Sequence, residues 1–388
     1  MREGAFREGA AFKRVLFIAA CAAFAAALAL PLIEVLAQSF DGGLAAAAGN
    51  YSGALLKKRM ARAIAHSFLV SGIVATASTA IASCAACYAA DQIVIYSNAD
   101  EEAQEAMKHA LDGNGFAWRY VLQAFGTSEL GGKLMAEKQD IEADIITLST
   151  YYLDLAQARD HVFADLTFPH KAVDGSEVPF YAPILGNTGA LFVNTKVLKD
   201  SGLKAPKRIA DLADDAYAGR ISVPDIKGSS TSWLMTQALI SEYGEEKGTA
   251  LTRKIEENAG DHLEMSGSGP LKKIRAGEVA GGFGLRHQAV ADKKKDLSVD
   301  VIDPKEGNFT LTEALAVVDK GGKANPDAMK AAEIIVTKAR PELLKSYPFA
   351  IYPGEAVDSE LVPAYPRAFK EKLTIELLKK HQEMVKDE

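Results

Sequence analysis

The feature that most constrains this fold is a regular alternation of short apolar strands and polar-headed helices that begins near residue 92. Residues 92–96, 118–124 and 143–147 are rich in β-branched and aromatic residues, which is typical of short strands. A helix that ends near residue 111 and another over residues 127–137 separate them. Strands and helices that alternate at this spacing predict parallel βαβ units and therefore a doubly wound α/β fold.

The second part of the chain departs from this simple pattern. A strand is expected over residues 189–194, and the helices and strands predicted after it occupy residues 221–225, 233–243, 245–258, 268–275, 279–283, 300–303, 310–318, 326–340 and 369–386. At 388 residues the chain is longer than a typical single domain, so two lobes or domains are expected.

Charge is distributed unevenly along the chain. Residues 1–90 hold 8 Lys and Arg and 4 Asp and Glu, out of totals of 44 and 51, so residues 91–388 hold 36 and 47 and carry a net charge of −11. An acidic folded part argues against nucleic acid as a partner, although local dipoles still permit an anionic small ligand. All three cysteines, Cys21, Cys84 and Cys87, precede residue 91, so no disulfide framework or thiolate metal site is expected beyond it.

The first ninety residues contain two uncharged runs, at residues 15–33 and 68–88, each long enough to span a membrane. With the short motifs at residues 30–33 and 63–71, this segment resembles the opening of an ABC-importer permease subunit. The resemblance implies one or two apolar N-terminal helices that contact the membrane.

A second interpretation of the same segment starts the protein at Met60. Residues 68–82 are then the apolar core of a signal peptide, followed by a lipoprotein-like cleavage box that ends at Cys84. The basic residues on either side of the first run do not decide between the two topologies. Export is the favoured interpretation, because the rest of the chain resembles an exported protein.

Small polar loops recur where predicted strands end. After the strand at residues 221–225, Ser229, Ser230 and Thr231 lead into a helix. Unpaired N–H groups and hydroxyls at such a helix start, together with the helix dipole, favour an anion. Ordinary N-capping by serine or threonine is the alternative. Comparable loops contribute further candidate binding residues: Ser97 and Asn98, Thr127 and Ser128, Thr188, and Ser268.

Motifs for catalysis are missing from the sequence. It contains no His-Glu-x-x-His pair, no Gly-x-Ser-x-Gly elbow, no Walker loop and no complete Gly-x-Gly-x-x-Gly; residues 281–284 supply such a loop's glycines only in part. Tyr151 and Tyr152 could act as phenolate ligands of Fe(III), but packing of the pair at a helix start is the favoured interpretation. We therefore predict no catalytic residue, no resident metal and no cofactor.

Arg286, His287 and Gln288 follow the strand predicted at residues 279–283. The guanidinium of an arginine presents parallel N–H donors that match two oxygens of a phosphonate, phosphate or carboxylate. His287 and Gln288 could donate further hydrogen bonds to the same group. The alternative interpretation is that these residues form the surface start of a helix.

Five motifs beyond residue 91 resemble one known family: residues 186–194 (GNTGALFVN), 211–221 (DLADDAYAGRI), 267–270 (GSGP), 281–288 (GGFGLRHQ) and 306–313 (EGNFTLTE). They resemble the periplasmic solute-binding proteins of ABC importers, in the group that contains Fe(III)- and phosphonate-binding members. The resemblance implies an α/β, two-lobed periplasmic-binding-protein fold of type II, with the chain crossing between lobes near residues 191–194 and 310–318. Its implied organisation is a membrane or signal segment followed by two lobes: residues 1–90, then 91–190 plus 312–388 as lobe 1, and 191–311 as lobe 2.

Iron-binding relatives carry a tyrosine pair after the strand that corresponds to residues 279–283, where this chain has Leu285, Arg286, His287 and Gln288. The resemblance therefore implies an anionic ligand, 2-aminoethylphosphonate or a related phosphonate. It further implies a monomer, in the periplasm or at the outer face of the cytoplasmic membrane, that delivers the ligand to an ABC permease and its ATPase. Fe(III) binding by the same fold and a phosphonate-processing enzyme are the alternatives.

The predicted ligand-binding residues combine the polar loops with the segment that follows residue 283. They are Ser97, Asn98, Thr127, Ser128, Tyr151, Thr188, Asp225, Ser229, Ser230, Thr231, Ser268, Arg286 and His287. Asp225 and Tyr151 are the residues expected to hold the ligand's amine, because a carboxylate or an aromatic face attracts a cation.

Overall fold

The computed structural model describes residues 92–295, 297–322, 324–359 and 361–386. The two apolar runs predicted before residue 91 lie outside the described residues. Within the described ranges, no helix combines the length and the hydropathy needed to cross a membrane.

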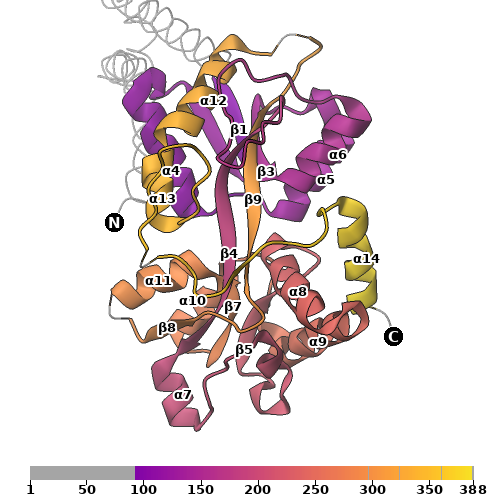
Figure 1. Cartoon of the computed structure of the whole chain (residues 1–388), viewed down its shortest axis with the longest axis vertical. Helices are drawn as coiled ribbons and strands as arrows, with labels where there is room; N and C mark the ends of the chain where they lie inside the picture. The colour runs from indigo at the N-terminus through magenta and orange to yellow at the C-terminus, as the bar shows by residue number, and fades with distance from the viewer. Residues whose placement is uncertain (1–91, 296, 323, 360, 387–388) are drawn as a thin grey trace, which may run out of the picture. The chain divides into compact units, whose positions relative to one another are not determined.

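The upper half of the molecule in Figure 1 is built on the βαβ units that the sequence predicts. Strands β1 (Ile93–Ser97), β2 (Tyr120–Ala124) and β3 (Ile145–Ser149) are parallel and lie in the order β2-β1-β3. Two longer strands, β9 (Asn308–Val317) and β4 (Ala182–Asn194), continue the sheet with antiparallel pairing. The predicted parallel arrangement is thus confirmed here, with an antiparallel pair added beside it.

Helices cover both faces of this sheet, with α4, α12 and α13 on one side and α5 and α6 on the other (Figure 1). Their bounds are α4 (Glu101–Leu111), α5 (Thr127–Glu137), α6 (Thr150–Asp160), α12 (Pro326–Lys338) and α13 (Arg340–Ser346). Helix α4 begins after Asp100, whose carboxylate accepts a hydrogen bond from the Ala103 N–H. Ala103, Met107 and Leu111 recur once per turn and are buried with Ile93 in one apolar cluster.

The lower half of Figure 1 is a second sheet that shares β4 with the first. Strands β7 (Gly281–Leu285) and β8 (Val299–Ile302) are antiparallel to β4, and β5 (Ile221–Pro224) runs parallel to β7 and to the short β6 (Leu263–Glu264). The helices of this half are α7 (Thr195–Ser201), α8 (Ser230–Tyr243), α9 (Glu245–Ala259), α10 (Gly269–Ala276) and α11 (Arg286–Lys294). Short helical turns complete the described elements at η1 (Asp112–Phe116), η2 (Lys138–Asp140), η3 (Ile209–Ala213), η4 (Asp215–Tyr217) and η5 (Gly260–His262).

The glycines of β7 allow close packing within this second sheet. A Cβ atom on Gly282 would lie 1.8 Å from the carbonyl oxygen of Ser222 on β5, and one on Gly284 would lie 2.6 Å from the ring of Phe192. Only glycine fits at these two positions, because a real Cβ atom cannot approach so closely. The partial resemblance to a dinucleotide loop is therefore explained by strand packing.

Strands β4 and β9 are the elements that pass through both halves (Figure 1). Strand β4 pairs with β9 from Ala182 to Thr188 and with β7 from Gly189 to Val193. One strand therefore belongs to both sheets, as expected for a chain crossing between two lobes. The exact lobe boundaries that the sequence proposed remain a prediction.

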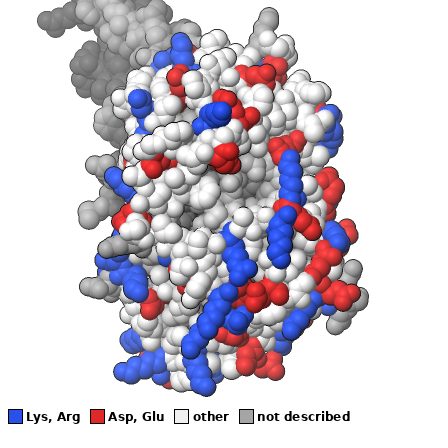
Figure 2. Space-filling model, viewed as in Figure 1, with Lys and Arg blue, Asp and Glu red and all other residues white. Residues whose placement is uncertain are grey.

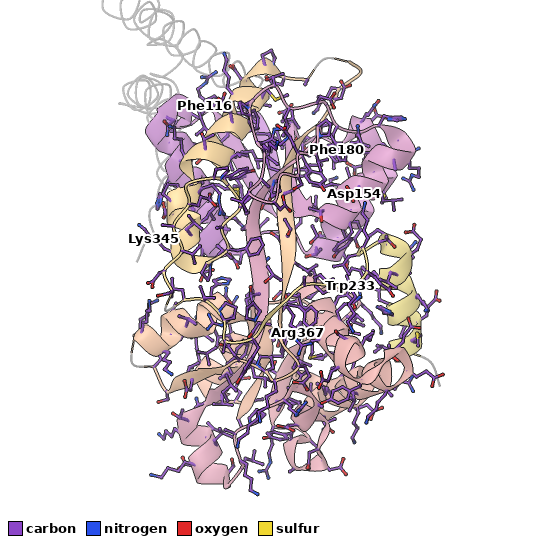
Figure 3. All side chains as sticks on the ribbon, viewed as in Figure 1. Phe116, Asp154, Phe180, Trp233, Lys345 and Arg367 are labelled. Atoms are coloured by element: carbon purple, nitrogen blue, oxygen red, sulfur yellow. The ribbon has the colours of Figure 1, made fainter. Side chains whose placement is uncertain are left out.

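The C-terminal part of the chain crosses in front of these strands and ends beside the lower half (Figure 1). Strand β10 (Pro366–Arg367) pairs with the start of β9, and α14 (Ile375–Lys386) packs against α9. Trp233 of α8, labelled in Figure 3, donates a hydrogen bond of 3.0 Å from Nε1 to His381 Nδ1 of α14. Helix α14 also contacts α6 of the upper half. The sequence predicted its start at residue 369, six residues before the observed start at Ile375.

Candidate ligand-binding site

The first turns of two helices face each other where the upper and lower halves meet. Thr127 Oγ1 at the start of α5 lies 3.4 Å from Ser230 Oγ at the start of α8, and either hydroxyl could be the donor. Beside this pair, Ser128 Oγ donates a hydrogen bond of 2.8 Å to the Lys227 carbonyl. Figure 2 shows a hollow on the surface between the two halves. The structure thus brings together hydroxyls that lie about a hundred residues apart in the sequence.

Side-chain hydrogen bonds continue from Thr127 into the interior. Asn98 Nδ2 donates to Thr127 Oγ1 (3.1 Å) and to Glu313 Oε1 on β9 (3.0 Å). Asn187 Nδ2 on β4 donates to the same Glu313 oxygen (2.9 Å). Ser230, Thr127, Asn98, Glu313 and Asn187 therefore form a continuous chain across the molecule, which we call the cleft network.

The interior end of the cleft network has oxygens without donors. Glu313 Oε2, Asn98 Oδ1 and Asn187 Oδ1 are buried and have no hydrogen-bond partner among the described residues. The hydroxyls of Ser149 and Tyr151 are buried and unpaired in the same way. Each buried polar atom left unpaired costs about 1–3 kcal/mol, so a cluster of them marks a place where a ligand could supply the missing partners.

Glu313 itself is only 2% exposed. Burial raises the pKa of its carboxyl to about 7, and the neighbouring Asp100 carboxylate adds to that effect, whereas the hydrogen bonds from Asn98 and Asn187 act in the opposite direction. A carboxyl group with such a pKa exchanges its proton near neutral pH. It can therefore change charge when a cation arrives.

A second polar cluster joins the two halves between α11 and α4, and we call it the His287 cluster. His287 Nε2 lies 3.0 Å from Asp100 Oδ2 and 3.8 Å from Glu102 Oε2, and the Tyr347 hydroxyl donates to Asp100. Gln288 Nε2 also donates to Glu102 Oε2 (3.1 Å). This cluster pairs groups of opposite charge across the contact.

The two acidic residues determine the charge of the imidazole. Burial opposes ionisation of His287, but the ion pairs with Asp100 and Glu102 outweigh it and raise its pKa to about 9. Burial likewise opposes ionisation of Glu102, and its interactions with His287 lower its pKa to about 2. The side-chain ligand atoms of these three residues lie within 4.8 Å of one another, so they are the described group that could hold a metal ion. As the cluster stands, the imidazolium is its cation.

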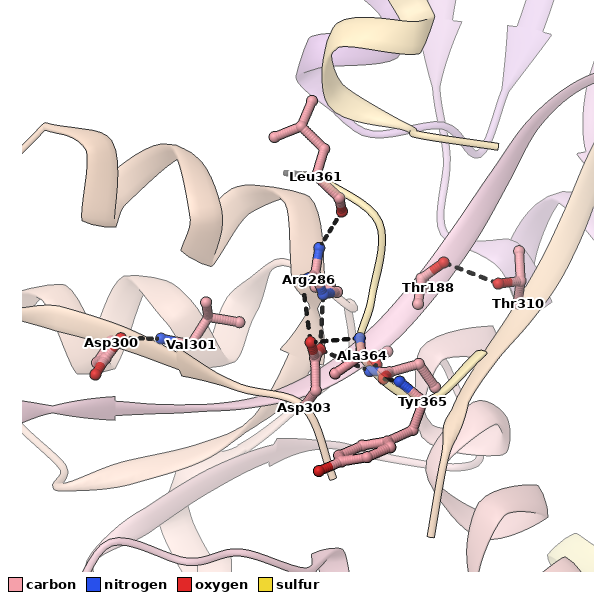
Figure 4. Close-up of polar contacts among 11 residues, drawn as sticks. Thr188, Arg286, Asp300, Val301, Asp303, Thr310, Leu361, Ala364 and Tyr365 are labelled. Carbon is pink, nitrogen blue, oxygen red and sulfur yellow. Dashed lines mark hydrogen bonds and ion pairs between the residues drawn. The ribbon is translucent and has the colours of Figure 1, made fainter. Parts of the chain in front are cut away.

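Arg286 has a different environment from the one predicted. Its Nε and Nη2 donate to the two oxygens of Asp303 (2.7 and 3.1 Å), and its Nη1 donates to the Leu361 carbonyl (Figure 4). Asp303 also accepts a hydrogen bond from the Ala364 N–H (2.9 Å). The two N–H groups of Arg286 that were predicted to hold a phosphonate thus bind the Asp303 carboxylate instead. Arg286 and Asp303 also attach the chain around Leu361 and Ala364 to the lower half.

Several other predicted residues lie at the start of α8. Ser229 is the N-cap of α8, with its hydroxyl accepting from the Thr231 N–H (3.2 Å). Ser268 lies on a loop that packs against the same turn, because a Cβ atom on Gly267 would lie 2.1 Å from Thr231 Oγ1. Ser229, Ser230, Thr231 and Ser268 are therefore neighbours. That they form one wall of a binding site remains a prediction.

The remaining predicted residues have partners of their own. Ser97 is fully buried and accepts from Thr147 Oγ1 (2.6 Å), so it links two strands inside the sheet. Thr188 Oγ1 lies 2.8 Å from Thr310 Oγ1 on the paired strands (Figure 4). Asp225 Oδ1 accepts from the Lys227 N–H (2.7 Å) in a local turn. None of these three contacts belongs to the cleft network.

The tyrosine pair packs as the sequence analysis favoured. The rings of Tyr151 and Tyr152 lie 5.0 Å apart, and Tyr151 meets the edge of Trp233 on α8 at 5.2 Å. Burial raises the pKa of both phenols, which disfavours the phenolate that would bind Fe(III). The unpaired hydroxyl of Tyr151 nevertheless lies close enough to Glu313 for the two groups to interact electrostatically.

Two residues of the cleft network, Glu313 and Asn187, were not among the predicted binding residues. Glu313 lies in β9 and directly precedes the apolar run ALAVV. An acidic residue in a buried strand is rare unless it is paired. That contrast is the sequence signal that could have identified it. Asn187 offers no comparable signal, because it lies in a loop-like stretch of small residues.

Comparison with known proteins agrees with the fold. Residues 157–370 match the model of a family described as bacterial extracellular solute-binding protein. Because the match covers more than half of the sequence, this chain belongs to that family. An uncharacterized protein of Haemophilus influenzae is 23% identical over 231 residues, which is 56% of this chain and 65% of that relative, so the match spans less than two thirds of its length.

Solved structures of binding proteins share the architecture. The substrate-binding protein of an ABC transporter from Agrobacterium tumefaciens has a TM-score of 0.62 and 15% identity, covering 76% of this chain and 94% of that one. The periplasmic binding protein AfuA from Actinobacillus pleuropneumoniae, with fructose-6-phosphate bound, gives 0.61 and 18%, covering 76% and 96%. Iron-bound HitA from Pseudomonas aeruginosa gives 0.55 and 17%, covering 76% and 97%. At these identities the likeness establishes the fold and leaves the ligand to the site.

Proposed function

We propose that this protein captures a small phosphonate, 2-aminoethylphosphonate or a close analogue, outside the cytoplasm and delivers it to an ABC permease and its ATPase. The observation that carries the proposal is the meeting of two helix starts, with Thr127 of α5 3.4 Å from Ser230 of α8. The first N–H groups of a helix lack partners within the helix, and its dipole favours negative charge at that end. Two such ends lie close together here and favour an anion between them.

Neighbouring residues support this assignment. Thr231 and Ser268 lie around the start of α8, and Ser128 lies beside Thr127 at the start of α5. Their hydroxyls can rotate to donate to the several oxygens of a phosphonate group. In this proposal Arg286 does not touch the ligand, since its guanidinium is engaged by Asp303.

Fe(III) binding is the second candidate, because Asp100, Glu102 and His287 have the spacing of metal ligands. A titration with ferric citrate distinguishes the two functions. Ferric binding to oxygen and nitrogen ligands would give a stoichiometric ferric complex measurable by iron analysis after gel filtration. We expect no such complex, since the imidazole of His287 would have to release the proton that its raised pKa retains at neutral pH.

Calorimetry on the full chain tests the proposed function directly. The titrants are 2-aminoethylphosphonate, ethylphosphonate, inorganic phosphate, sulfate and ferric citrate. We expect saturable one-to-one binding of phosphonates, and a ligand at 100 times its Kd should stabilise the fold by about 2.7 kcal/mol in a thermal unfolding experiment. Phosphorus NMR should recover the ligand unchanged, whereas a converted product would support an enzyme. Absence of phosphonate binding would overturn the proposal.

A further inference from the structure

The two ends of the cleft network lack opposite kinds of partner. At the helix starts, the contacting groups are the hydroxyls of Thr127 and Ser230, which can turn their protons toward an anion. At the interior end, the unpaired atoms are oxygens: Glu313 Oε2, Asn98 Oδ1 and Asn187 Oδ1. A ligand that satisfied both ends would carry an anionic group at one end and a group rich in hydrogen-bond donors at the other.

We infer that Glu313, with the amide oxygens of Asn98 and Asn187, forms a subsite for a primary ammonium group of the ligand. The inference rests on the proposed function and names the second half of the ligand that the helix starts would hold. An ammonium group has three N–H donors and no acceptor, which matches a group of oxygens that lack donors. A neutral alkyl chain would leave those oxygens unpaired.

Hydrogen bonds connect the three side chains that carry these oxygens. Both amides donate their Nδ2 to Glu313 Oε1, at 3.0 Å from Asn98 and 2.9 Å from Asn187. Each unpaired amide oxygen is bonded to the same carbon as that nitrogen, and Oε2 shares its carbon with Oε1. Both amide oxygens therefore belong to groups that contact the same carboxylate. The two amides hold that carboxylate in place, and its negative charge attracts the ammonium.

The same contacts limit the length of the ligand. Asn98 Nδ2 contacts both Thr127 Oγ1 (3.1 Å) and Glu313 Oε1 (3.0 Å), so only one amide nitrogen separates the donating end from the accepting end. A short zwitterion, in which two or three carbons join an amine to a phosphonate, fits this spacing. Longer polyamines would extend beyond it.

The residues first expected to hold the amine are less suitable. Asp225 is engaged in its own turn through the Lys227 N–H. Tyr151 presents only a hydroxyl, which remains unpaired near Glu313 and could add one acceptor to the subsite. Glu313 is therefore the buried carboxylate with an unpaired oxygen at this site.

The test compares two ligands on the full chain by calorimetry: 2-aminoethylphosphonate and ethylphosphonate, which lacks the amine. We expect the wild-type protein to bind the amine-bearing ligand at least about 30-fold more tightly, because a buried charge pair typically contributes 2 kcal/mol or more. Glu313→Gln keeps the shape of the side chain and removes its charge, so it should abolish most of the preference for the amine-bearing ligand over ethylphosphonate. The matched control is Glu306→Gln, because Glu306 is a fully buried carboxylate that accepts from the Ile209 and Ala210 N–H groups instead.

The outcomes separate the inference from the proposed function. If the wild-type protein binds both phosphonates with equal affinity, or if Glu313→Gln keeps the full preference, the ammonium subsite is refuted while phosphonate binding stands. If the wild-type protein binds neither phosphonate, both proposals fail. The wild-type comparison needs no variant, so it remains decisive even if Glu313→Gln does not fold.

Discussion

Two polar regions of the molecule, the start of α11 and the cleft network, differ in how their groups are paired. On the α11 side, the charged groups of Arg286 and His287 face carboxylates at 2.7 and 3.0 Å. In the cleft network, uncharged amides and hydroxyls contact one buried carboxylate, and several of their oxygens have no partner. A buried charge that faces an opposite charge is already compensated within the protein. A buried polar atom without a partner can still accept a hydrogen bond from a ligand. We therefore expect the first region to contribute mainly to stability, and we propose the second as the ligand-binding region.

The largest effect is expected from Arg286→Ala, measured as the free energy of unfolding in urea. Removing the guanidinium leaves the buried Asp303 carboxylate without its cation, which should lower the free energy of unfolding by about 3 kcal/mol. The double variant Arg286→Ala/Asp303→Ala should recover part of that loss because no orphaned carboxylate remains. An unchanged stability with a strongly weakened phosphonate affinity would instead support the role in ligand binding that the sequence predicted.

The stability of the wild-type protein should fall as pH rises from 6.5 to 9. The pKa of His287 is raised from 6.5 to about 9 in the folded state, so its ion pairs stabilise the fold fully below pH 6.5 and are lost as pH passes through about 9. The difference corresponds to a loss of up to about 3 kcal/mol. His287→Asn should flatten this part of the pH profile in urea unfolding. The control is His109→Asn, because the side chain of His109 is 52% exposed; this substitution should leave the pH profile unchanged.

Affinity for the amine-bearing phosphonate should rise as pH increases from 5 to about 7. Free Glu313, with its pKa raised to about 7, must release a proton to pair with an ammonium group, so binding releases protons below that pH. The gain relative to Glu313→Gln with the same ligand should approach tenfold per pH unit, because that comparison cancels the titration of the ligand's own phosphonate group. The other titratable groups that act on Glu313 are Asp100, His287, Tyr151 and Tyr347; His287 titrates near pH 9, and burial raises the pKa of both tyrosines. A pH dependence that persists in Glu313→Gln would assign it to another group.

The smallest effect is expected from Thr127→Val, which removes one hydroxyl of the donating end while keeping the side-chain shape. Loss of one hydrogen bond should weaken both phosphonates by about 1 kcal/mol, or roughly fivefold, without altering the preference between them. Thr236→Val is the matched control, because its buried hydroxyl donates to the Ser232 carbonyl within α8. Equal effects of the two substitutions on affinity would contradict a direct role for Thr127.

Much of the local structure could be predicted from the sequence. Periodicity and caps identified β1, β3, α9 and α12 with nearly their observed bounds, because these elements depend on neighbours along the chain. The start of α14 was placed six residues too early, because Phe369 and Leu373 lie four residues apart and continue the helical spacing of apolar residues. In the structure, residues 369–374 are not helical. Helices α7 and α13, each seven residues long, were not predicted, and the start of α11 at Arg286 was given only as the alternative interpretation of that segment.

The site was predicted only in part. The clustering of Ser229, Ser230 and Thr231 followed from one helix start, and their meeting with Thr127 followed from the expected two-lobed fold. Arg286 was assigned to the ligand because a guanidinium suits a phosphonate, but Asp303, which engages it, lies on the far side of β8 in the sequence. Residue type states what a side chain can bind, and only its surroundings state what it does bind.

By itself the sequence determined the βαβ units, the family motifs and the donor-rich loops, because each depends on residues close together in the chain. The tertiary structure alone decided which polar groups are paired and which remain unpaired. Asn98 and Glu313 are 215 residues apart and meet only because β4 and β9 run beside the ends of the first strands. Hydrogen-bond pairing depends on distance in space, and that distance is set by the packing of the whole chain.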